Sequence, residues 1–216
     1  QAVINDKYKT KSCTAYRDIH KLLARPDIDG VVIATGDRWH ALASIMAMRA
    51  GKDVYCEKPS CFTLAEGQQV VDTARRYSRV YQTGTQRLSE ANHVYAIEMA
   101  RTGRLGKIHT VYADIRYRGG SRYDWLPAQP TPPKDEVDWD AWLGPCPWRP
   151  YNSKYVNHGW YDFYDFATDV AMWGAHTIAQ ALAGLDMSNV KHMEMLYGSP
   201  GNTIVTRLSN GIKLVL

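Results

Sequence analysis

The segment GVVIATGDRWHALASIMAMRAGKDVYCEKPS, residues 30–60, decides the fold. Its first part, residues 30–36, is a β-branched run between glycines, which is typical of a parallel strand buried on both faces. Residues 40–52 have the apolar spacing of a helix that ends at Gly51, where a left-handed cap is favoured. The next strand, residues 53–59, ends in Glu-Lys-Pro, and proline stops a strand. Strand, helix and strand in this order predict a βαβ unit with a parallel sheet.

The flanking segments extend this pattern on both sides. Residues 15–29 have helical spacing and predict a short helix. Residues 63–78 predict a longer helix that Thr63 opens, with Glu66 placed as in a capping box. Residues 80–87 predict a further strand and turn. The fold class is therefore α/β, with part of a doubly wound parallel sheet in the first half of the chain.

The second half has a different pattern, which divides the chain into domains at residues 1–88 and 89–216. We expect an α+β domain here, with an open, mostly antiparallel sheet that stops mid-sheet at the C-terminal end. A loop of about forty residues separates its elements, and loops of that length are usually functional or disordered. The expected helices are 90–102 and 168–185, and the expected strands are 107–118, 190–198, 202–209 and 212–216.

Composition excludes several classes of protein. The hydrophobic share of 45% and charged share of 22% are ordinary for a globular protein. The net charge of +4 comes from scattered residues, which argues against nucleic-acid binding, and no apolar run has the length of a membrane span. The four cysteines have no metal-ligand spacing, so we expect no metal. They favour a reducing compartment such as the cytoplasm, although export to the periplasm stays open.

Three motifs carry a resemblance to a known family. AGKDVYCEKP (50–59), YQTGTQR (81–87) and MWGAH (172–176) resemble the Gfo/Idh/MocA family of NAD(P)-dependent oxidoreductases. The family has a Rossmann domain followed by an α/β domain with an open sheet, and its members often form homodimers or homotetramers. The first glycine of this chain is Gly30, so we interpret it as a partial chain without the N-terminal Gly-rich βαβ unit. The resemblance implies NAD or NADP as cofactor and a small carbohydrate as substrate.

The resemblance also implies catalytic residues. Lys58 matches the family lysine beside the nicotinamide, and His176 matches the histidine that exchanges a proton with the substrate hydroxyl. Family members commonly carry an aspartate four residues before this histidine, where Met172 stands here. Asp169 lies two helical turns before His176 and is the candidate replacement. The alternative for Lys58 and Glu57 is a solvated strand end, and a lone helical histidine is often structural.

Further residues lie where ligands bind, beyond the carboxyl ends of the strands. The predicted cofactor contacts are Thr35, Gly36, Asp37, Trp39, His40, Glu57, Lys58 and Gln86, and the predicted substrate contacts are Arg87, Lys58, Tyr161 and His176. Asp37 has an alternative role as a helix N-cap. The loop aromatics Tyr117, Trp125, Trp148, Tyr151, Trp160 and Tyr161 suit either a sugar-stacking wall or packing.

The predicted function is hydride transfer between nicotinamide and a hydroxyl or keto carbon of a sugar, polyol or glycoside. Two alternatives stay open. One is an NAD-dependent glycosidase that works by redox and elimination steps, and the other is a non-catalytic sugar-binding member. The absent Gly-rich turn and Met172 favour the second alternative. The choice between NAD and NADP and the identity of the substrate are open.

Overall fold

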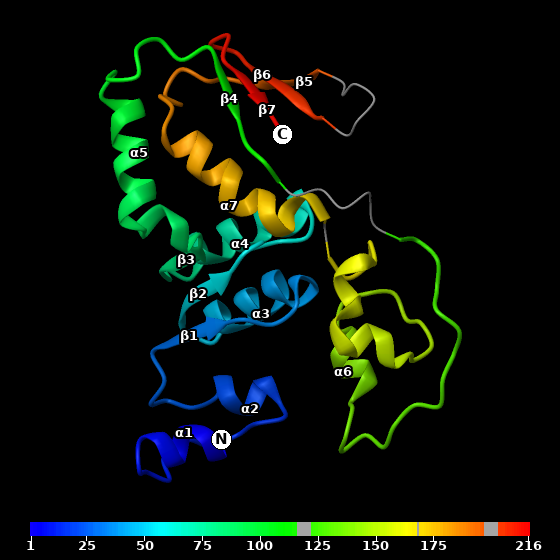
Figure 1. Ribbon diagram of the computed structural model, residues 1–216. Coiled ribbons are helices and arrows are strands. Elements are labelled where there is room, and N and C mark those ends of the chain that lie inside the picture. Colours follow the sequence, from blue (N-terminus) through cyan, green and yellow to red (C-terminus); the bar gives the residue numbers. More distant parts are fainter. Residues whose placement is uncertain (116–121, 168, 197–202) are drawn as a thin grey trace.

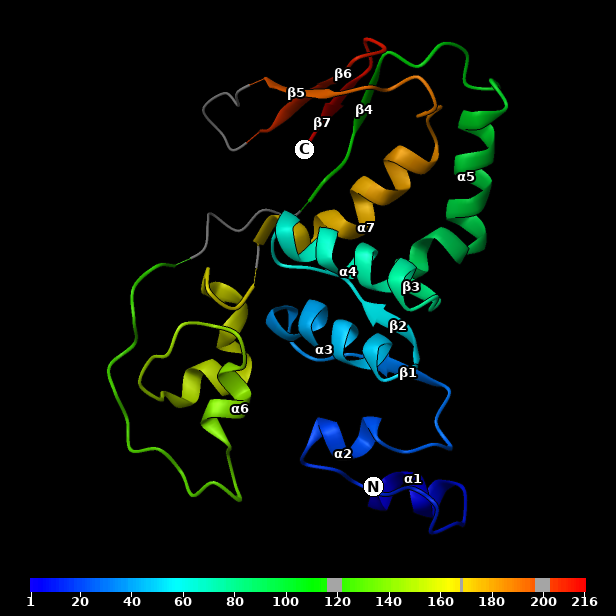
Figure 2. The same ribbon diagram turned by 180° about the vertical axis from the view of Figure 1, so that it is seen from behind.

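The computed structural model describes residues 1–115, 122–167, 169–196 and 203–216, apart from the side chains of His158 and Asp169. Figures 1 and 2 show three parts: a parallel sheet with its helices, a second sheet above helices α5 and α7, and a lobe beside helix α3. Among the described residues, no helix has the length and apolar character needed to cross a membrane.

The first sheet confirms the predicted parallel arrangement, but the expected burial of its first strand on both faces is wrong, since that strand lies at the edge of the sheet and Val32 is 73% exposed. Its strands are β1 (Gly30–Ile33), β2 (Asp53–Glu57) and β3 (Tyr81–Gly84), hydrogen-bonded in the order β1-β2-β3. Both pairings are parallel, with Val54 of β2 opposite Val31 and Tyr81. Since all three strands run the same way, their carboxyl ends meet at one edge of the sheet.

The helices of this half agree only in part with the predicted ranges, since the helix expected over residues 15–29 is confined to Ile19–Leu23. They are α1 (Ala2–Lys7), α2 (Ile19–Leu23), α3 (Asp37–Arg49) and α4 (Leu64–Arg76). Helix α3 packs on β1, β2 and α4, and its inner side places Ala47 and Met48 in the core with Val54 and Cys56. Gly51 has φ +80°, as expected for a glycine after a helix. The sequence pattern placed the start of α3 three residues too late and missed α1.

The second half contains an α/β arrangement around a mixed sheet. Its elements are the 3₁₀ turn Gln86–Ser89, α5 (Ala91–Arg101), β4 (Thr110–Tyr112), α7 (Asp169–Ala183), β5 (Met193–Leu196), β6 (Val205–Leu208) and β7 (Lys213–Val215). The strand order is β4-β7-β6-β5. Strands β5, β6 and β7 pair antiparallel as expected, whereas β4 pairs parallel to β7. The boundary between residues 88 and 89 stays a prediction.

Residues 122–167 form what we call the aromatic lobe, in the region predicted as a long loop. It contains α6 (Trp139–Leu143), a π-helical turn (Tyr155–Gly159) and a 3₁₀ turn (Trp160–Asp162). Its core consists of Trp139, Leu143, Tyr151, Tyr155, Phe163 and Phe166. Arg149 is only 1% exposed within this core, where it pairs with Asp165. The lobe therefore has a small hydrophobic core of its own.

The capping box of α4 gives a direct test of the helix boundary. The Thr63 hydroxyl accepts from the Glu66 N–H (3.1 Å), and the Glu66 carboxylate accepts from the Thr63 N–H (3.0 Å). We expect Thr63→Ala to lower the free energy of unfolding by about 1 kcal/mol, because the N–H of residue 66 loses its acceptor. Urea unfolding followed by circular dichroism measures this loss. Thr63→Ser keeps the hydroxyl, so a similar loss in that variant would contradict the explanation.

Candidate functional site

The Lys58 side chain links the first sheet to helix α7. Lys58 follows β2 directly, and a cis peptide bond joins it to Pro59. Its Nζ donates a hydrogen bond to the main-chain oxygen of Met172 at 2.7 Å. The two residues are 114 positions apart in sequence. This contact brings the Glu-Lys-Pro end of β2 to the helix that carries His176.

His176 lies one helical turn after Met172 and has an electrostatic environment suited to a base. Burial lowers its pKa, and the cations of Lys58 and Arg87 lower it further, while Glu57 and Glu90 oppose the shift. Its Nδ1 is buried and has no hydrogen-bond partner among the described residues. These influences favour the uncharged form of the imidazole, which is the form that can accept a proton.

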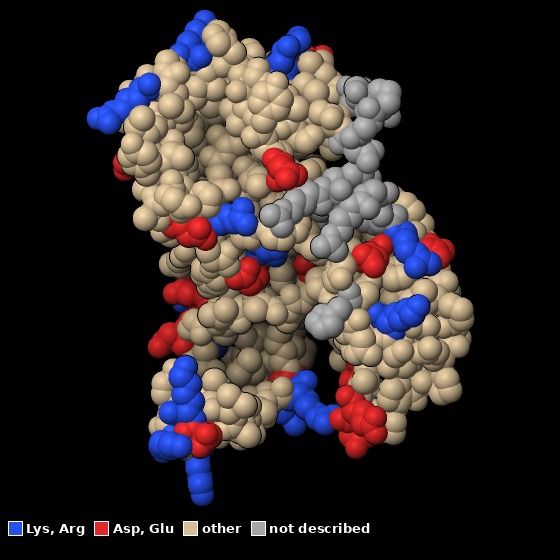
Figure 3. Space-filling view, viewed as in Figure 1, with Lys and Arg blue, Asp and Glu red and all other residues tan. Residues whose placement is uncertain are grey.

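Glu57, Gln86 and Arg87 gather at the ends of β2 and β3. The Gln86 amide donates to the Glu57 carboxylate, which also accepts from the Lys58 N–H at 3.3 Å. The Arg87 guanidinium lies 5.5 Å from the centre of the Trp173 ring on α7. Basic and acidic side chains accordingly lie close together near the middle of the molecule in Figure 3. The structure thus brings Lys58, His176, Glu57, Gln86 and Arg87 into one region.

His40 occupies a different position, inside the protein below the strand ends. It is 1% exposed, and its ring nitrogens lie 2.6 Å from the Pro59 oxygen and 2.8 Å from the Thr35 oxygen. Ser44 in turn donates to the His40 main-chain oxygen at 2.6 Å. The ring therefore ties the segment after β1 to the segment after β2. Its predicted contact with the nicotinamide stays a prediction.

The other predicted cofactor residues surround the start of α3. Thr35 is exposed, and Gly36 rather than Asp37 occupies the N-cap position. The alternative of Asp37 as the N-cap is therefore wrong, since Asp37 is the first helical residue and is 5% exposed. Trp39 donates its indole N–H to the Ala141 oxygen at 3.0 Å, so its ring lies against the aromatic lobe.

The remaining candidates are dispersed. Asp169 begins α7, and its side chain lies outside the described part. Tyr161 is partly buried beside Trp160, with ring centres 5.9 Å apart. Tyr151 belongs to the lobe core, Trp125 and Trp148 are exposed, and Tyr117 lies outside the described residues. The loop aromatics thus have different environments, and packing accounts for Tyr151.

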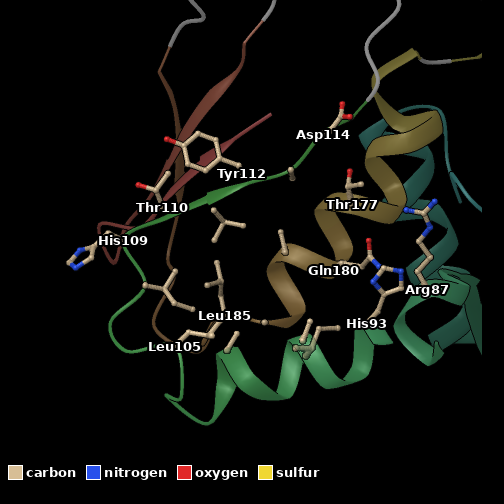
Figure 4. Close-up of a pocket in the computed structure, with 18 of the residues that line it drawn as sticks. Arg87, His93, Leu105, His109, Thr110, Tyr112, Asp114, Thr177, Gln180 and Leu185 are labelled. Carbon is tan, nitrogen blue, oxygen red and sulfur yellow. The ribbon is translucent and has the colours of Figure 1, made fainter. Parts of the chain in front are cut away.

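Two features escaped the sequence analysis. Arg38 is 6% exposed at the start of α3, and burial lowers its pKa to about 10. A cavity of about 1010 Å³ lies between α5, α7 and β4, with Arg87, His93, Thr177 and Gln180 at its polar end (Figure 4). Cavities of this size suit small ligands. Arg38 is the second residue of α3, and Gln180 lies within the apolar helix α7. Neither position shows in the sequence that the arginine is buried or that the glutamine lines a cavity.

Metal binding has no support among the side chains that the structure describes. No group of three or more histidine, cysteine, aspartate or glutamate residues there is placed to hold an ion.

The first part of the chain is similar to a known protein family. Residues 2–85 match the model of the GFO_IDH_MocA family, described as an oxidoreductase family with an NAD-binding Rossmann fold. Over this segment the chain is similar to the Gfo/Idh/MocA oxidoreductases, the family that the sequence motifs also indicated. The parallel sheet and the Glu-Lys-Pro strand end lie within the matched residues.

Several characterised proteins are similar over part of the chain. The myo-inositol 2-dehydrogenase of Thermotoga maritima is 29% identical over 97 residues, or 45% of this chain and 29% of that protein. The 1,5-anhydro-D-fructose reductase of Ensifer adhaerens is 31% identical over 107 residues, or 47% of this chain and 32% of that protein. A glycosyl hydrolase family 109 protein of Shewanella baltica is 48% identical over 62 residues, or 29% and 13%. The alignments thus span no more than about a third of these relatives.

Solved structures share the fold over nearly the whole chain. The inositol dehydrogenase homolog of Azotobacter vinelandii, complexed with NAD+, is 18% identical to this chain, with a TM-score of 0.65. The alignment covers 98% of this chain and 52% of that one. The biliverdin reductase of Synechocystis sp. PCC 6803, in complex with biliverdin and NADP+, has a TM-score of 0.59 at 18% identity. That alignment covers 99% of this chain and 58% of the reductase. This chain therefore spans about half the length of these structures.

The charge of Lys58 gives a prediction about His176. Replacement by Met in Lys58→Met removes a cation that disfavours the imidazolium, so we expect the pKa of His176 to rise toward its ordinary value. An NMR titration of the histidine ring protons measures this shift. Lys21→Met, at an exposed position on α2, is the control and should leave the titration unchanged. An unchanged pKa in Lys58→Met would contradict a contribution of the Lys58 charge to the pKa of His176.

The buried His40 ring predicts a large effect on stability. His40→Leu removes the buried ring N–H that serves the carbonyl oxygens of Thr35 and Pro59, and we expect the free energy of unfolding to fall by about 2–3 kcal/mol. Chemical denaturation measures the change. His20→Leu on the exposed side of α2 is the matched control and should have little effect. Equal effects of the two substitutions would contradict the assigned role of His40.

Proposed function

We propose that the protein is an NAD- or NADP-dependent oxidoreductase that acts on a CH–OH group of a sugar, polyol or glycoside. The observation that carries the proposal is the convergence of Lys58 and His176, which the Lys58–Met172 hydrogen bond of 2.7 Å holds near each other. A cationic lysine and an uncharged histidine are the groups needed to move a hydroxyl proton. The family assignment of residues 2–85 supports the reaction class.

The two residues have separate roles in this proposal. His176 accepts the hydroxyl proton of the substrate on its uncharged imidazole ring. Lys58 lies beside the same oxygen and stabilises the negative charge that develops on it. Arg87 contributes a second cation to the site and binds other substrate oxygens. In the reverse direction His176 returns the proton.

The cofactor fits the edge of the sheet where the carboxyl ends of the strands meet. Thr35, Gly36 and the N-terminal end of α3 would contact ribose or phosphate, because the N-terminus of a helix favours a bound anion. Gln86 and Glu57 would lie near the nicotinamide, and Glu57 keeps Gln86 oriented. When bound, the nicotinamide accepts or supplies the hydride, and the protein handles the proton.

A glycosidase that uses bound NAD is the second candidate. The observation that favours it is the 48% identity to the glycosyl hydrolase family 109 protein over 62 residues. Such an enzyme releases a free sugar from a glycoside with no net formation of NADH. A dehydrogenase instead produces NADH in proportion to the sugar that it oxidises. Measuring both products from the same reaction separates the two candidates.

A homo-oligomer belongs to the same proposal. Tyr112 on β4 is 79% exposed, and Met193 and Met195 on β5 are 56% and 74% exposed. Large apolar side chains on a sheet surface are common at interfaces between subunits. A dimer or tetramer through the second sheet would bury them.

Loss of the Lys58 amine tests the proposed chemistry. With inositols and other polyols as substrates, we expect Lys58→Ala to lower kcat about 100-fold or more, as is usual when a group that assists proton transfer is removed. Reduced nicotinamide is followed by its absorbance, and NADH binding by fluorescence. Lys21→Ala is the control. Wild-type turnover in Lys58→Ala would overturn the proposal, and sugar binding without turnover in the wild-type protein would favour a sugar-binding role instead.

A further inference from the structure

Arg38 makes an unusual set of contacts between two parts of the chain. Its Nε donates to the Trp142 oxygen at 2.7 Å, and its guanidinium lies 3.7 Å from the centre of the Trp142 ring. Trp160 and Phe166 also lie within 6 Å of it, at 5.8 and 5.6 Å. The arginine is therefore enclosed by aromatic rings of the lobe, although it belongs to α3. Arg38 and Trp142 are 104 residues apart in sequence.

The neighbouring Trp39 makes a second contact with the same turn of the lobe. Its indole N–H donates to the Ala141 oxygen at 3.0 Å. Gly144, at φ +58°, faces the indole ring so closely that a Cβ atom there would lie 2.4 Å from it. Only glycine allows this approach. Arg38 and Trp39 thus both donate hydrogen bonds to main-chain oxygens near the C-terminal end of α6.

The aromatic lobe also contacts the segment that follows β2. The Tyr164 ring lies 6.1 Å from the Phe62 ring, edge to face, and Phe62 follows the Glu-Lys-Pro turn by three residues. The Glu66 carboxylate accepts a hydrogen bond from the Phe62 N–H at 2.7 Å. The lobe therefore contacts both the start of α3, after β1, and the segment after β2. These two segments border the crevice at the carboxyl ends of the strands.

We propose that Arg38 is a positioning residue, which with Trp39 fastens the aromatic lobe over one side of the cofactor and substrate crevice. The proposal rests on the proposed function for its effect on catalysis. Its structural part, the attachment of the lobe, stands on the contacts alone. The lobe places Trp160 near Arg38, and the ring of Tyr161, a candidate substrate contact, lies beside Trp160.

Lysine cannot replace arginine in this position. The flat guanidinium stacks on Trp142 and donates from Nε to the main chain in one geometry, whereas an ammonium group is compact and strongly hydrated. The site is nearly closed to solvent, so a lysine would lose hydration without the stacking contact. The contact thus depends on the shape of the cation as well as on its charge.

Hydrogen exchange tests the attachment without any assay of activity. The N–H groups of Trp142 and Gly144 are hydrogen-bonded within α6, at 2.8 and 2.9 Å, and report on the lobe. The Val54 N–H, bonded to Val80 at 2.9 Å, reports on the parallel sheet. In Arg38→Lys and in Trp39→Phe, we expect about tenfold faster exchange at the lobe amides, since a stacking contact or a hydrogen bond is lost. Exchange at Val54 should stay the same.

The outcomes are distinct. Arg49→Lys, on the exposed end of α3, is the matched control and should change neither set of amides. Unchanged exchange in the lobe of Arg38→Lys overturns the proposal. An equal increase at Val54 also overturns it, because the substitution would then have destabilised the whole protein.

The catalytic part is tested with polyol substrates and NAD or NADP. We expect Arg38→Lys to raise KM for the polyol about tenfold with kcat within about twofold, and NADH binding unchanged, as for loss of substrate positioning before the chemical step. A fall in kcat with KM unchanged would contradict this role. If the wild-type protein shows no turnover, the proposed function fails while the exchange experiment still decides whether Arg38 fastens the lobe.

Discussion

The His40 ring is the interaction on which the arrangement of the site depends. Parallel strands leave their carboxyl ends at one edge, but the segments that follow them are irregular and need other contacts to hold their positions. His40 meets the oxygens of Thr35 and Pro59 at 2.8 and 2.6 Å, so one buried ring fixes the segments after β1 and β2 relative to each other. Thr35 leads into α3, and Pro59 follows Lys58. The positions of both sides of the crevice therefore depend on a residue that is itself 1% exposed.

Electrostatics adds a second property to this geometry. Lys58 and Arg87 place two cations near His176, and a main-chain oxygen rather than a carboxylate accepts the hydrogen bond from Lys58. The positive charge is consequently only partly balanced by Glu57 and Glu90. Such a site favours the uncharged imidazole and attracts oxygen atoms that carry negative charge. Both effects suit the removal of a proton from a hydroxyl group.

The sequence predicted those parts of the fold that local patterns determine. The β-branched run of β1, the capping box of α4 and the glycine after α3 each set an element boundary within a few residues. Helix α6 was missed because five residues are too few to show a helical period. The parallel pairing of β4 with β7 was missed as well, since the order of strands in a sheet depends on contacts between distant segments.

The candidate site was predictable to a similar degree. The Glu-Lys-Pro and Trp-Gly-Ala-His motifs identified Lys58 and His176, and the structure brings these two residues together. The sequence did not predict that the His40 ring lies between two carbonyl oxygens. Nor did it predict that Arg38 lies among aromatic rings of residues more than 100 positions away. Both depend on tertiary packing, which a single sequence shows only through motifs.

The hydrogen bond from Lys58 to the main-chain oxygen of residue 172 makes the position of the lysine independent of the side chain at 172. Every amino acid at this position supplies the same main-chain oxygen, so the location of the lysine does not depend on which residue stands there. The side chain at 172, one turn before His176, is then free to change in charge or size. Evolution can thus vary the acidity of the site at this position while the geometry of the lysine is inherited unchanged.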